Sequence, residues 1–137
     1  MSDIVVKDTG TPRGRGVFAN KVFIEGDVVE VCPVIVLSTP YSELIEELRL
    51  IVFQWIKEKP PKRNVQALVL GYGSLYNHAN PSNMRYEVDR PALVVRYIAD
   101  RDIDVGEELT INYNSTGGGT TSDRDWWFEQ TKTDLIP

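Results

Sequence analysis

The chain has 137 residues, a length that suits one domain with a single hydrophobic core. With 42% hydrophobic and 26% charged residues it has the composition of a soluble globular protein, and no apolar run reaches the roughly 20 residues that would span a bilayer. A net charge of −5 argues against a nucleic-acid-binding protein, which usually carries a basic patch, and favours a basic partner.

The single cysteine, Cys32, excludes an internal disulfide and a zinc site built from several thiolates, and we expect no metal site. Cys32 lies in a strand-like stretch, where core packing is expected, although a catalytic pair with His78 is an alternative that the composition allows. The first residues lack the basic and apolar regions of a signal peptide, which predicts an intracellular protein without membrane contact.

The first part of the chain is typical of short strands separated by glycine, proline and aspartate turns. Residues 4–7 and 16–19 are predicted strands. A turn is expected at 24–27, and residues 28–37 are expected to form two strands interrupted at Pro33, because proline cannot donate to a ladder hydrogen bond.

Residues 39–43, Thr-Pro-Tyr-Ser-Glu, predict the start of a short helix, because they supply a cap, a proline in the first turn and an acidic residue. Leu44, Ile45 and Leu48 would give this helix an apolar face. Residues 50–56 are β-branched and aromatic, and both a strand and a continued helix account for them.

The second half of the chain follows the same β-rich pattern. Strands are predicted at 65–70, 84–88, 92–99 and 109–113, the middle two forming a hairpin. Residues 115–122 contain three consecutive glycines and are expected to be flexible. Three aromatic residues follow, Trp126, Trp127 and Phe128. The mostly β pattern with one short helix argues against a doubly wound α/β fold.

Three short motifs could carry chemistry. The first is Arg-Gly-Arg-Gly at residues 13–16, where glycine permits close approach of a ligand to the backbone. The second, at 71–78, ends in Tyr-Asn-His, contains the only histidine of the chain and is followed by Asn83. Its polar surroundings predict a loop rather than a strand. The third, Gly-Glu-Glu-Leu-Thr-Ile-Asn-Tyr at 106–113, is a turn and a strand that ends at Tyr113.

In this order and spacing, the three motifs resemble the signature motifs of the SET-domain family of protein-lysine methyltransferases, and the matched stretch runs from about Val6 to Tyr113. The resemblance implies a mostly β fold, the SET-domain β-clip of several small sheets with one short helix and a C-terminal pseudoknot. It places the SET domain at residues 1–114 and a flexible glycine-rich segment with an aromatic, post-SET-like tail at 115–137.

The resemblance also implies an activity, the transfer of a methyl group from S-adenosylmethionine to a lysine side chain of a protein or peptide substrate, with histones among the candidates. Such a reaction needs a neutral lysine amine aligned with the methyl group, and an apolar aromatic channel favours the neutral amine. The small size of the chain leads to the hypothesis that a homodimer or a helper protein completes the substrate-binding surface.

Site residues follow from the same resemblance. Tyr113 is the implied catalytic tyrosine, with Tyr86, three residues after Asn83, as a second candidate. The residues implied to bind the cofactor are Arg15, Gly16, Tyr76, Asn77, His78 and Trp127. Trp126 is an alternative to Trp127, and both tryptophans would equally serve as a hydrophobic anchor for the tail.

The second motif departs from the usual form of the family, which has serine at the position of Ala79, often cysteine at Asn80, and proline directly before the last asparagine. Here Pro81 comes one residue earlier and Ser82 takes that place. The altered loop is the best support for an alternative, a non-catalytic SET-fold binding module, whereas the presence of Tyr113, Asn77 and His78 together favours an enzyme. A β-rich interaction domain unrelated to the family would require three coincidental motifs.

Overall fold

The computed structural model describes residues 2–57, 64–115 and 118–122, so the predicted aromatic tail lies outside the described residues. The helical elements are a 3-10 turn at Tyr41–Glu43 and the helix α1 at Glu46–Arg49. The strands are β1 (Ile4–Asp8), β2 (Arg15–Ala19), β3 (Val28–Leu37), β4 (Phe53–Lys57), β5 (Asn64–Val69), β6 (Asn77–His78), β7 (Met84–Asp89), β8 (Val94–Ala99) and β9 (Glu108–Ile111).

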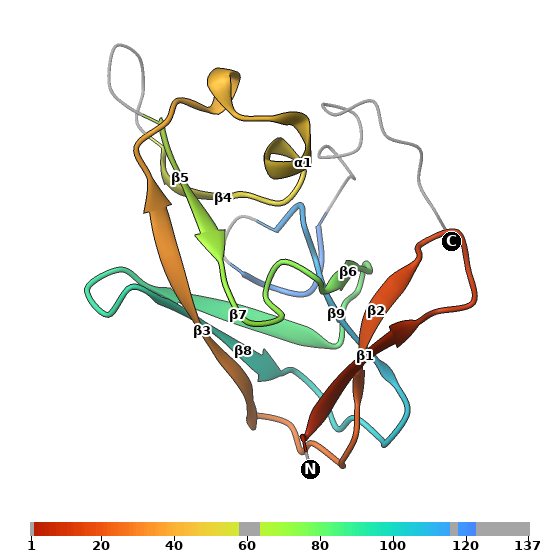
Figure 1. Ribbon diagram of the computed structural model, residues 1–137. Coiled ribbons are helices and arrows are strands. Elements are labelled where there is room, and N and C mark those ends of the chain that lie inside the picture. The colour runs from red at the N-terminus through yellow and green to blue at the C-terminus, as the bar shows by residue number, and fades with distance from the viewer. Residues whose placement is uncertain (1, 58–63, 116–117, 123–137) are drawn as a thin grey trace.

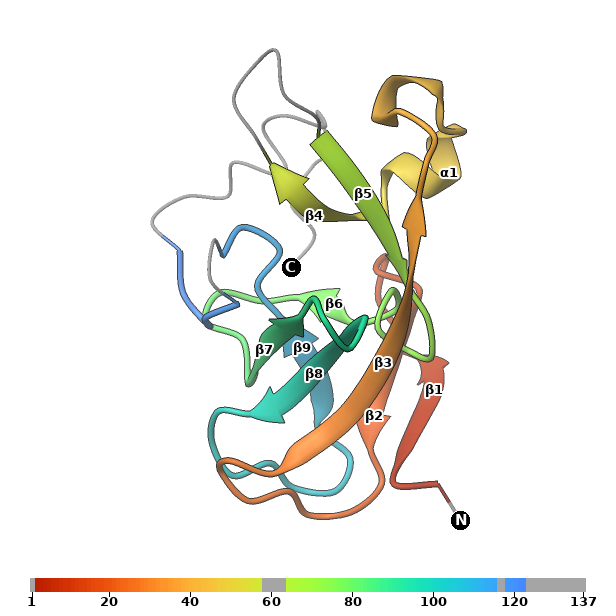
Figure 2. The same cartoon turned by 90° about the vertical axis from the view of Figure 1, so that its left-hand side faces the viewer.

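The described strands form two sheets. One has four strands in the order β1-β2-β9-β6, and the other has five in the order β4-β5-β3-β8-β7. Figures 1 and 2 show β3 running along the molecule, from a lower half that pairs with β8 to an upper half that pairs with β5. The predicted mostly β fold of several small sheets with one short helix is confirmed.

The interruption predicted at Pro33 is wrong, because β3 is one continuous strand. Pro33 is the last residue of β3 that pairs with β8, and Val34 is the first that pairs with β5. Proline therefore stands where one ladder ends and the next begins, a position at which its missing N–H interrupts neither ladder. The irregularity of β3 lies instead between Val28 and Glu30.

The predicted helix is shorter than expected. Leu44 and Ile45 are extended, so the segment divides into the 3-10 turn and the four-residue α1, and only Leu44 of the predicted apolar face is buried. Ile45 is 62% exposed. Of the two alternatives for residues 50–56, the strand is correct from Phe53 onward. No helix in the described ranges is long and apolar enough to cross a membrane.

Strand β9 connects the two halves of the small sheet. It pairs antiparallel with β2 and parallel with β6, which is formed by Asn77 and His78. The loop predicted at these two residues is therefore wrong, because β9 passes beside them and pairs with their backbone. β9 ends at Ile111, before Tyr113, since the Asn112 side chain accepts a hydrogen bond from the Asn114 N–H (2.9 Å) and turns the chain.

Candidate active site

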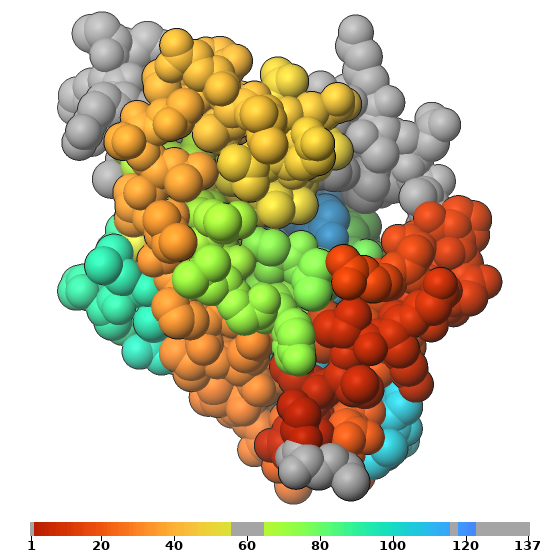
Figure 3. Space-filling view, viewed as in Figure 1, coloured from red at the N-terminus to blue at the C-terminus, as the bar shows by residue number. Residues whose placement is uncertain are grey.

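The three motifs meet beside β6. In Figure 1 β6 lies next to β9 and close to β2, which brings residues from the start, the middle and the end of the described chain together. The space-filling view in Figure 3 shows the green segment around β6 at the surface between the orange β3 and the red N-terminal strands. Sequence-distant residues thus share one region, as the resemblance implied.

Asn77 links the first motif to the third. Its side-chain amide donates to the Glu108 carboxylate (2.7 Å) and to the Arg15 carbonyl (3.0 Å). A Cβ atom at Gly16 would collide with the Glu108 carboxylate and lie 3.0 Å from the Asn77 amide, so any larger residue would displace the Glu108 side chain. The Arg15 side chain is exposed, and this residue takes part through its backbone.

His78 positions the segment that carries the candidate catalytic tyrosine. Its Nδ1 accepts a hydrogen bond from the Tyr113 backbone N–H (3.1 Å), and its carbonyl accepts one from the Arg13 guanidinium (2.8 Å). Because Nδ1 acts as an acceptor, the proton of the neutral ring is assigned to Nε2. The imidazole and Tyr113 rings lie 5.3 Å apart. Arg13 was not among the predicted site residues, although it stands in the first motif.

The Tyr113 hydroxyl points back toward the second motif. It donates a hydrogen bond to the Tyr76 carbonyl at 2.5 Å. Burial raises the pKa of Tyr113 to about 12, with Arg13 opposing the shift and Glu108 adding to it. The hydroxyl is therefore a neutral hydrogen-bond donor at physiological pH.

Tyr76 contributes its backbone rather than its ring to this region. The side chain is 1% exposed, its hydroxyl donates to the Glu30 carboxylate (2.6 Å), and its ring packs against Tyr97 at 4.8 Å between centroids. The Tyr76 carbonyl is the group that reaches Tyr113. Sequence reasoning missed Glu30, although a carboxylate within the apolar run Val-Val-Glu-Val-Cys is a sign of a buried polar partner.

Tyr86, the second catalytic candidate, lies on β7 in an aromatic cluster. Its ring packs edge-on against Phe53 (5.2 Å) and lies 6.1 Å from Tyr97, and its hydroxyl lies 3.5 Å from the Ser115 carbonyl. Burial raises its pKa. Tyr97 lies between Tyr86 and Tyr76, so the structure places Tyr86 in the aromatic wall beside the site.

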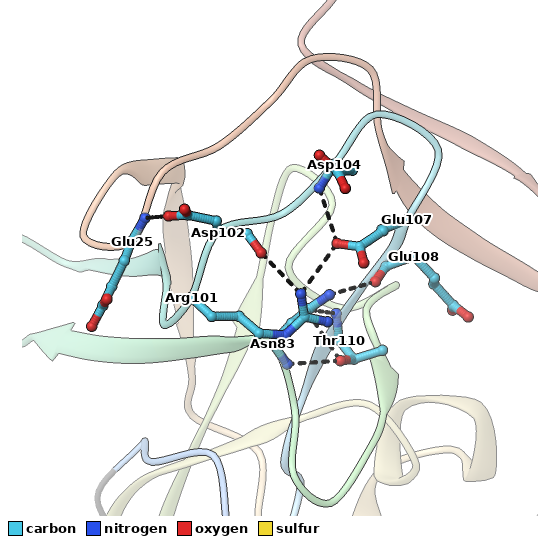
Figure 4. Close-up of polar contacts among 8 residues, drawn as sticks. All are labelled: Glu25, Asn83, Arg101, Asp102, Asp104, Glu107, Glu108 and Thr110. Carbon is cyan, nitrogen blue, oxygen red and sulfur yellow. Dashed lines mark hydrogen bonds and ion pairs between the residues drawn. The ribbon is translucent and has the colours of Figure 1, made fainter.

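Asn83, the last residue of the second motif, is a buried clamp on β9. Its side chain donates to the Glu108 carbonyl (2.8 Å) and accepts from the Thr110 N–H (2.9 Å), as Figure 4 shows. The Asn83 N–H in turn donates to the Thr110 hydroxyl (3.1 Å). The β2 and β6 ladders use one edge of β9, and Asn83 binds backbone groups on the other edge, which those ladders leave unpaired. These bonds fix the register of β9.

A cavity of about 450 Å³ lies beside this clamp, lined by Ser82, Asn83, Asp100, Arg101 and Thr110 among others. In Figure 4 Arg101 spans this area and bonds to the Asp102 carbonyl (2.9 Å) and to Glu107 (3.3 Å). The lining includes neither Asn77 nor Tyr113, but it includes Glu108, so the cavity adjoins the candidate active site at this residue.

The residues at which the second motif departs from the family pattern contact the segment 118–122. The Asn80 amide donates to the Ser122 carbonyl (3.0 Å), and the Ser82 N–H donates to the Thr120 carbonyl (3.0 Å). The Tyr86 N–H donates to the Gly118 carbonyl (2.9 Å). The altered loop therefore anchors the chain shortly before Trp126 and Trp127, which lie outside the described residues.

No group of three or more His, Cys, Asp or Glu side chains in the described part of the chain is placed to hold a metal ion. Cys32 is buried on the inner face of β3, and burial together with Glu30 raises the pKa of its thiol. No contact joins Cys32 to His78 among the described hydrogen bonds, and a neutral buried thiol is a poor nucleophile. The arrangement offers instead a neutral tyrosine hydroxyl, a backbone carbonyl and polar groups gathered on a glycine turn.

Comparison with known proteins gives a consistent result. A sequence model of the SET domain matches residues 14–114. A histone-lysine N-methyltransferase of Schizosaccharomyces pombe, specific for lysine 37 of histone H3, is 30% identical over 115 residues, which are 82% of this chain and 74% of that protein.

Two solved structures share the fold. A candidate histone methyltransferase of Plasmodium falciparum superposes with a TM-score of 0.65 at 22% identity, covering 85% of this chain and 96% of that chain. The polycomb repressive complex ctPRC2, in an autoinhibited conformation bound to S-adenosylmethionine, superposes with a TM-score of 0.64 at 16% identity, covering 98% of this chain and 17% of that chain.

Proposed function

The chain belongs to the SET-domain family, whose activity is protein-lysine methylation, and from this premise we propose that it transfers a methyl group from S-adenosylmethionine to a lysine of a basic protein. We further propose that Tyr113 is the catalytic tyrosine, that Tyr86 lines the lysine channel, and that Trp127 covers the bound donor. The observation that carries the proposal is the meeting of the three motifs at β6, where the first motif binds Asn77 and His78 and the third motif binds Tyr76 and His78 through Tyr113.

The groups beside β6 suit the proposed methyl donor. S-adenosylmethionine supplies, when bound, a methyl group on a positively charged sulfur. Its charged amino-acid end would be held by the oppositely charged Glu108 and Arg13, and its nucleoside by the backbone at Gly16, Asn77 and His78. The tight fit of Gly16 against Glu108 and Asn77 supports this assignment, because it gathers polar side chains at the start of β2.

The chain's own residues would act by orientation and by exclusion of water. The Tyr113 hydroxyl and the Tyr76 carbonyl form a fixed pair of oxygen atoms that can orient a neutral lysine amine. The rings of Tyr86, Phe53 and Tyr97 form an apolar wall that favours the neutral amine over the ammonium ion. Because Tyr113 stays neutral at physiological pH, it orients the amine as a dipole and does not add a negative charge.

For the substrate, we propose a lysine-rich protein segment such as a histone tail. The relative from Schizosaccharomyces pombe is named for lysine 37 of histone H3, and the net charge of −5 favours encounter with a basic chain. An intracellular location and a homodimer both stay predictions. The alternative of a non-catalytic module loses its main support, because the altered loop has a structural role in anchoring residues 118–122.

Two measurements test the proposal. Calorimetric titration with S-adenosylmethionine should show saturable binding that Asn77→Ala weakens by at least tenfold, because this change removes both hydrogen bonds of the Asn77 amide. Radiolabelled methyl transfer to histone H3 and to lysine-rich peptides should then follow, with Tyr113→Phe as the inactive control. Absence of donor binding by the wild-type protein would refute the proposed function.

A further inference from the structure

Glu30 is a carboxylate in an otherwise apolar strand. It lies on β3 directly opposite Tyr97, between Val29 and the half-exposed Val31, and it is itself only partly exposed. Placing a carboxylate against a core of this kind is unfavourable unless hydrogen bonds compensate for the lost water. The contacts of Glu30 therefore indicate what it does.

Both oxygen atoms of Glu30 bind the segment between β5 and β6. One accepts the Tyr76 hydroxyl (2.6 Å), and the other accepts the Tyr72 backbone N–H (3.0 Å). The segment approaches so closely that a Cβ atom at Gly71, where φ is +62°, would lie 2.5 Å from the carboxylate. A single side chain thus holds the start and the end of this connection with two charge-assisted hydrogen bonds.

This connection determines where the Tyr76 carbonyl lies. The Tyr76 ring is locked in the core by Glu30 at its hydroxyl and by Tyr97 at its face, and the carbonyl of the same residue accepts the Tyr113 hydroxyl. Other hydrogen bonds hold the connection itself, among them those from the Ser74 hydroxyl to the Val69 carbonyl (2.8 Å) and from the Leu75 N–H to the Tyr72 carbonyl (2.9 Å), but the Tyr76 hydroxyl is bound by Glu30. A shift at Glu30 would therefore be passed on to the group that orients Tyr113.

We propose that Glu30 is a positioning residue for methyl transfer, acting through Tyr76 to hold the carbonyl that orients the Tyr113 hydroxyl. The inference rests on the proposed function, since it assigns a role in that reaction to a residue outside the three motifs. A displacement of about 1 Å at a reacting group can lower a rate about 100-fold, so a partial loss of this anchor should be measurable.

Glu30→Gln tests the proposal with little change in shape. A glutamine accepts through one oxygen only, so it can keep the Tyr72 N–H only if the Tyr76 hydroxyl turns from donor to acceptor, and both bonds lose the assistance of the charge. We expect the single-turnover rate of methyl transfer to fall about tenfold, while the dissociation constant for S-adenosylmethionine stays within about twofold of wild type. Glu87→Gln removes the same charge from an exposed site, 57% exposed on β7, and should leave both values unchanged.

Tyr76→Phe is the second variant, because it keeps the ring and removes only the hydroxyl that Glu30 binds. It should lower the rate to the same extent as Glu30→Gln, and the double variant should be no slower than either single variant. Should Glu30→Gln fail to fold, Tyr76→Phe carries the test alone. A rate within twofold of wild type, or fully multiplicative losses in the double variant, would overturn the proposal.

A readout independent of activity separates this inference from the proposed function. In protein labelled with ¹³C at the tyrosine ring carbon that bears the hydroxyl, the Tyr113 resonance is identified by its loss in Tyr113→Phe. Glu30→Gln should shift this resonance, and Glu87→Gln should not. If the wild-type protein transfers no methyl group, the proposed function fails, yet a shift still supports the link from Glu30 to Tyr113. An unmoved resonance overturns the link, whatever happens to activity or to thermal stability.

Discussion

The two sheets are held together in different ways. In the five-stranded sheet, β3 and β8 form a long antiparallel ladder whose inner face joins buried apolar residues such as Cys32 and Val95. In the small sheet β9 has only short ladders with β2 and β6, and its position depends on polar side chains such as Asn83 and Asn77. Both sheets bury apolar residues, such as Val17 and Leu109 in the small one, but the small sheet depends in addition on side-chain hydrogen bonds for the register of β9.

This difference predicts that substitutions in the small sheet change activity more than those in the large one. The largest effect is expected at Tyr113. Tyr113→Phe should lower the rate of methyl transfer by roughly 1,000-fold, because it removes the hydroxyl that orients the amine, and the affinity for S-adenosylmethionine should change little. Radiolabel transfer under single-turnover conditions measures the rate. Tyr41→Phe is the matched control, since Tyr41 is 43% exposed.

The comparison is tested most directly by one buried residue that binds β9 of the small sheet and one that belongs to the large sheet. Asn83→Ala leaves the Thr110 N–H and the Glu108 carbonyl without their partner, and it should lower the free energy of unfolding by about 3 kcal/mol and the activity of the folded protein as well. Val95→Ala should lower that free energy by about 2 kcal/mol and leave the activity of the folded protein unchanged. Urea titration measures the change in stability, and transfer assays measure the change in activity. Equal losses of activity in the two variants would contradict the proposed difference between the sheets.

A smaller effect is expected where residues 118–122 join the site. Gly118 has φ +81°, and a Cβ atom there would collide with the Tyr86 carbonyl, whereas Gly10 has φ +76° and open space around it. Gly118→Ala should therefore lower the free energy of unfolding by about 2 kcal/mol and weaken donor binding. Gly10→Ala should lower that free energy by about 1 kcal/mol, because alanine disfavours a positive φ but meets no neighbouring atom there. Equal decreases in stability for the two variants, measured by thermal unfolding, would show that residue 118 can move away from the Tyr86 carbonyl.

The smallest effect at physiological pH concerns the buried tyrosines between the sheets. Burial raises the pKa of Tyr113 to about 12 and also raises the pKa values of Tyr76, Tyr86 and Tyr97. The unfolded chain, with tyrosine pKa values near 10, then releases protons before the folded protein does. The contribution of these tyrosines to stability should be constant below about pH 10 and should fall as the pH rises from about 10 to 12. Urea midpoints should show this fall, and Tyr113→Phe should reduce it.

The sequence was sufficient for the features that depend on local pattern. Short β-rich segments between glycine, proline and aspartate turns predicted β1, β2, β5, β7 and β8, and the order of the three motifs indicated that they share one region. The contacts formed across long sequence separations were not predictable in this way. Pro33 is tolerated because two different strands pair on either side of it, and Asn77 forms a strand because β9 passes beside it. Tertiary pairing overrode the local preference in both cases.

The role of Glu30 was hidden for a related reason. Nothing near it in sequence indicates its partners, since Tyr72 and Tyr76 follow more than forty residues later. A residue that acts through the backbone of another leaves no short motif. The same holds for Arg13, whose bond to the His78 carbonyl spans 65 residues.

The central place of β9 also has a consequence for how the protein is made. Both β2 and β6 pair with β9, which is synthesised only after residue 107. Shorter ribosome-bound chains therefore lack the strand that completes the small sheet. Contacts of such long sequence separation slow folding, because the entropy of closing the loop is lost before the contact forms and stabilises the structure. The large sheet is complete once β8 has emerged, so it would form first, and the small sheet would then assemble against it.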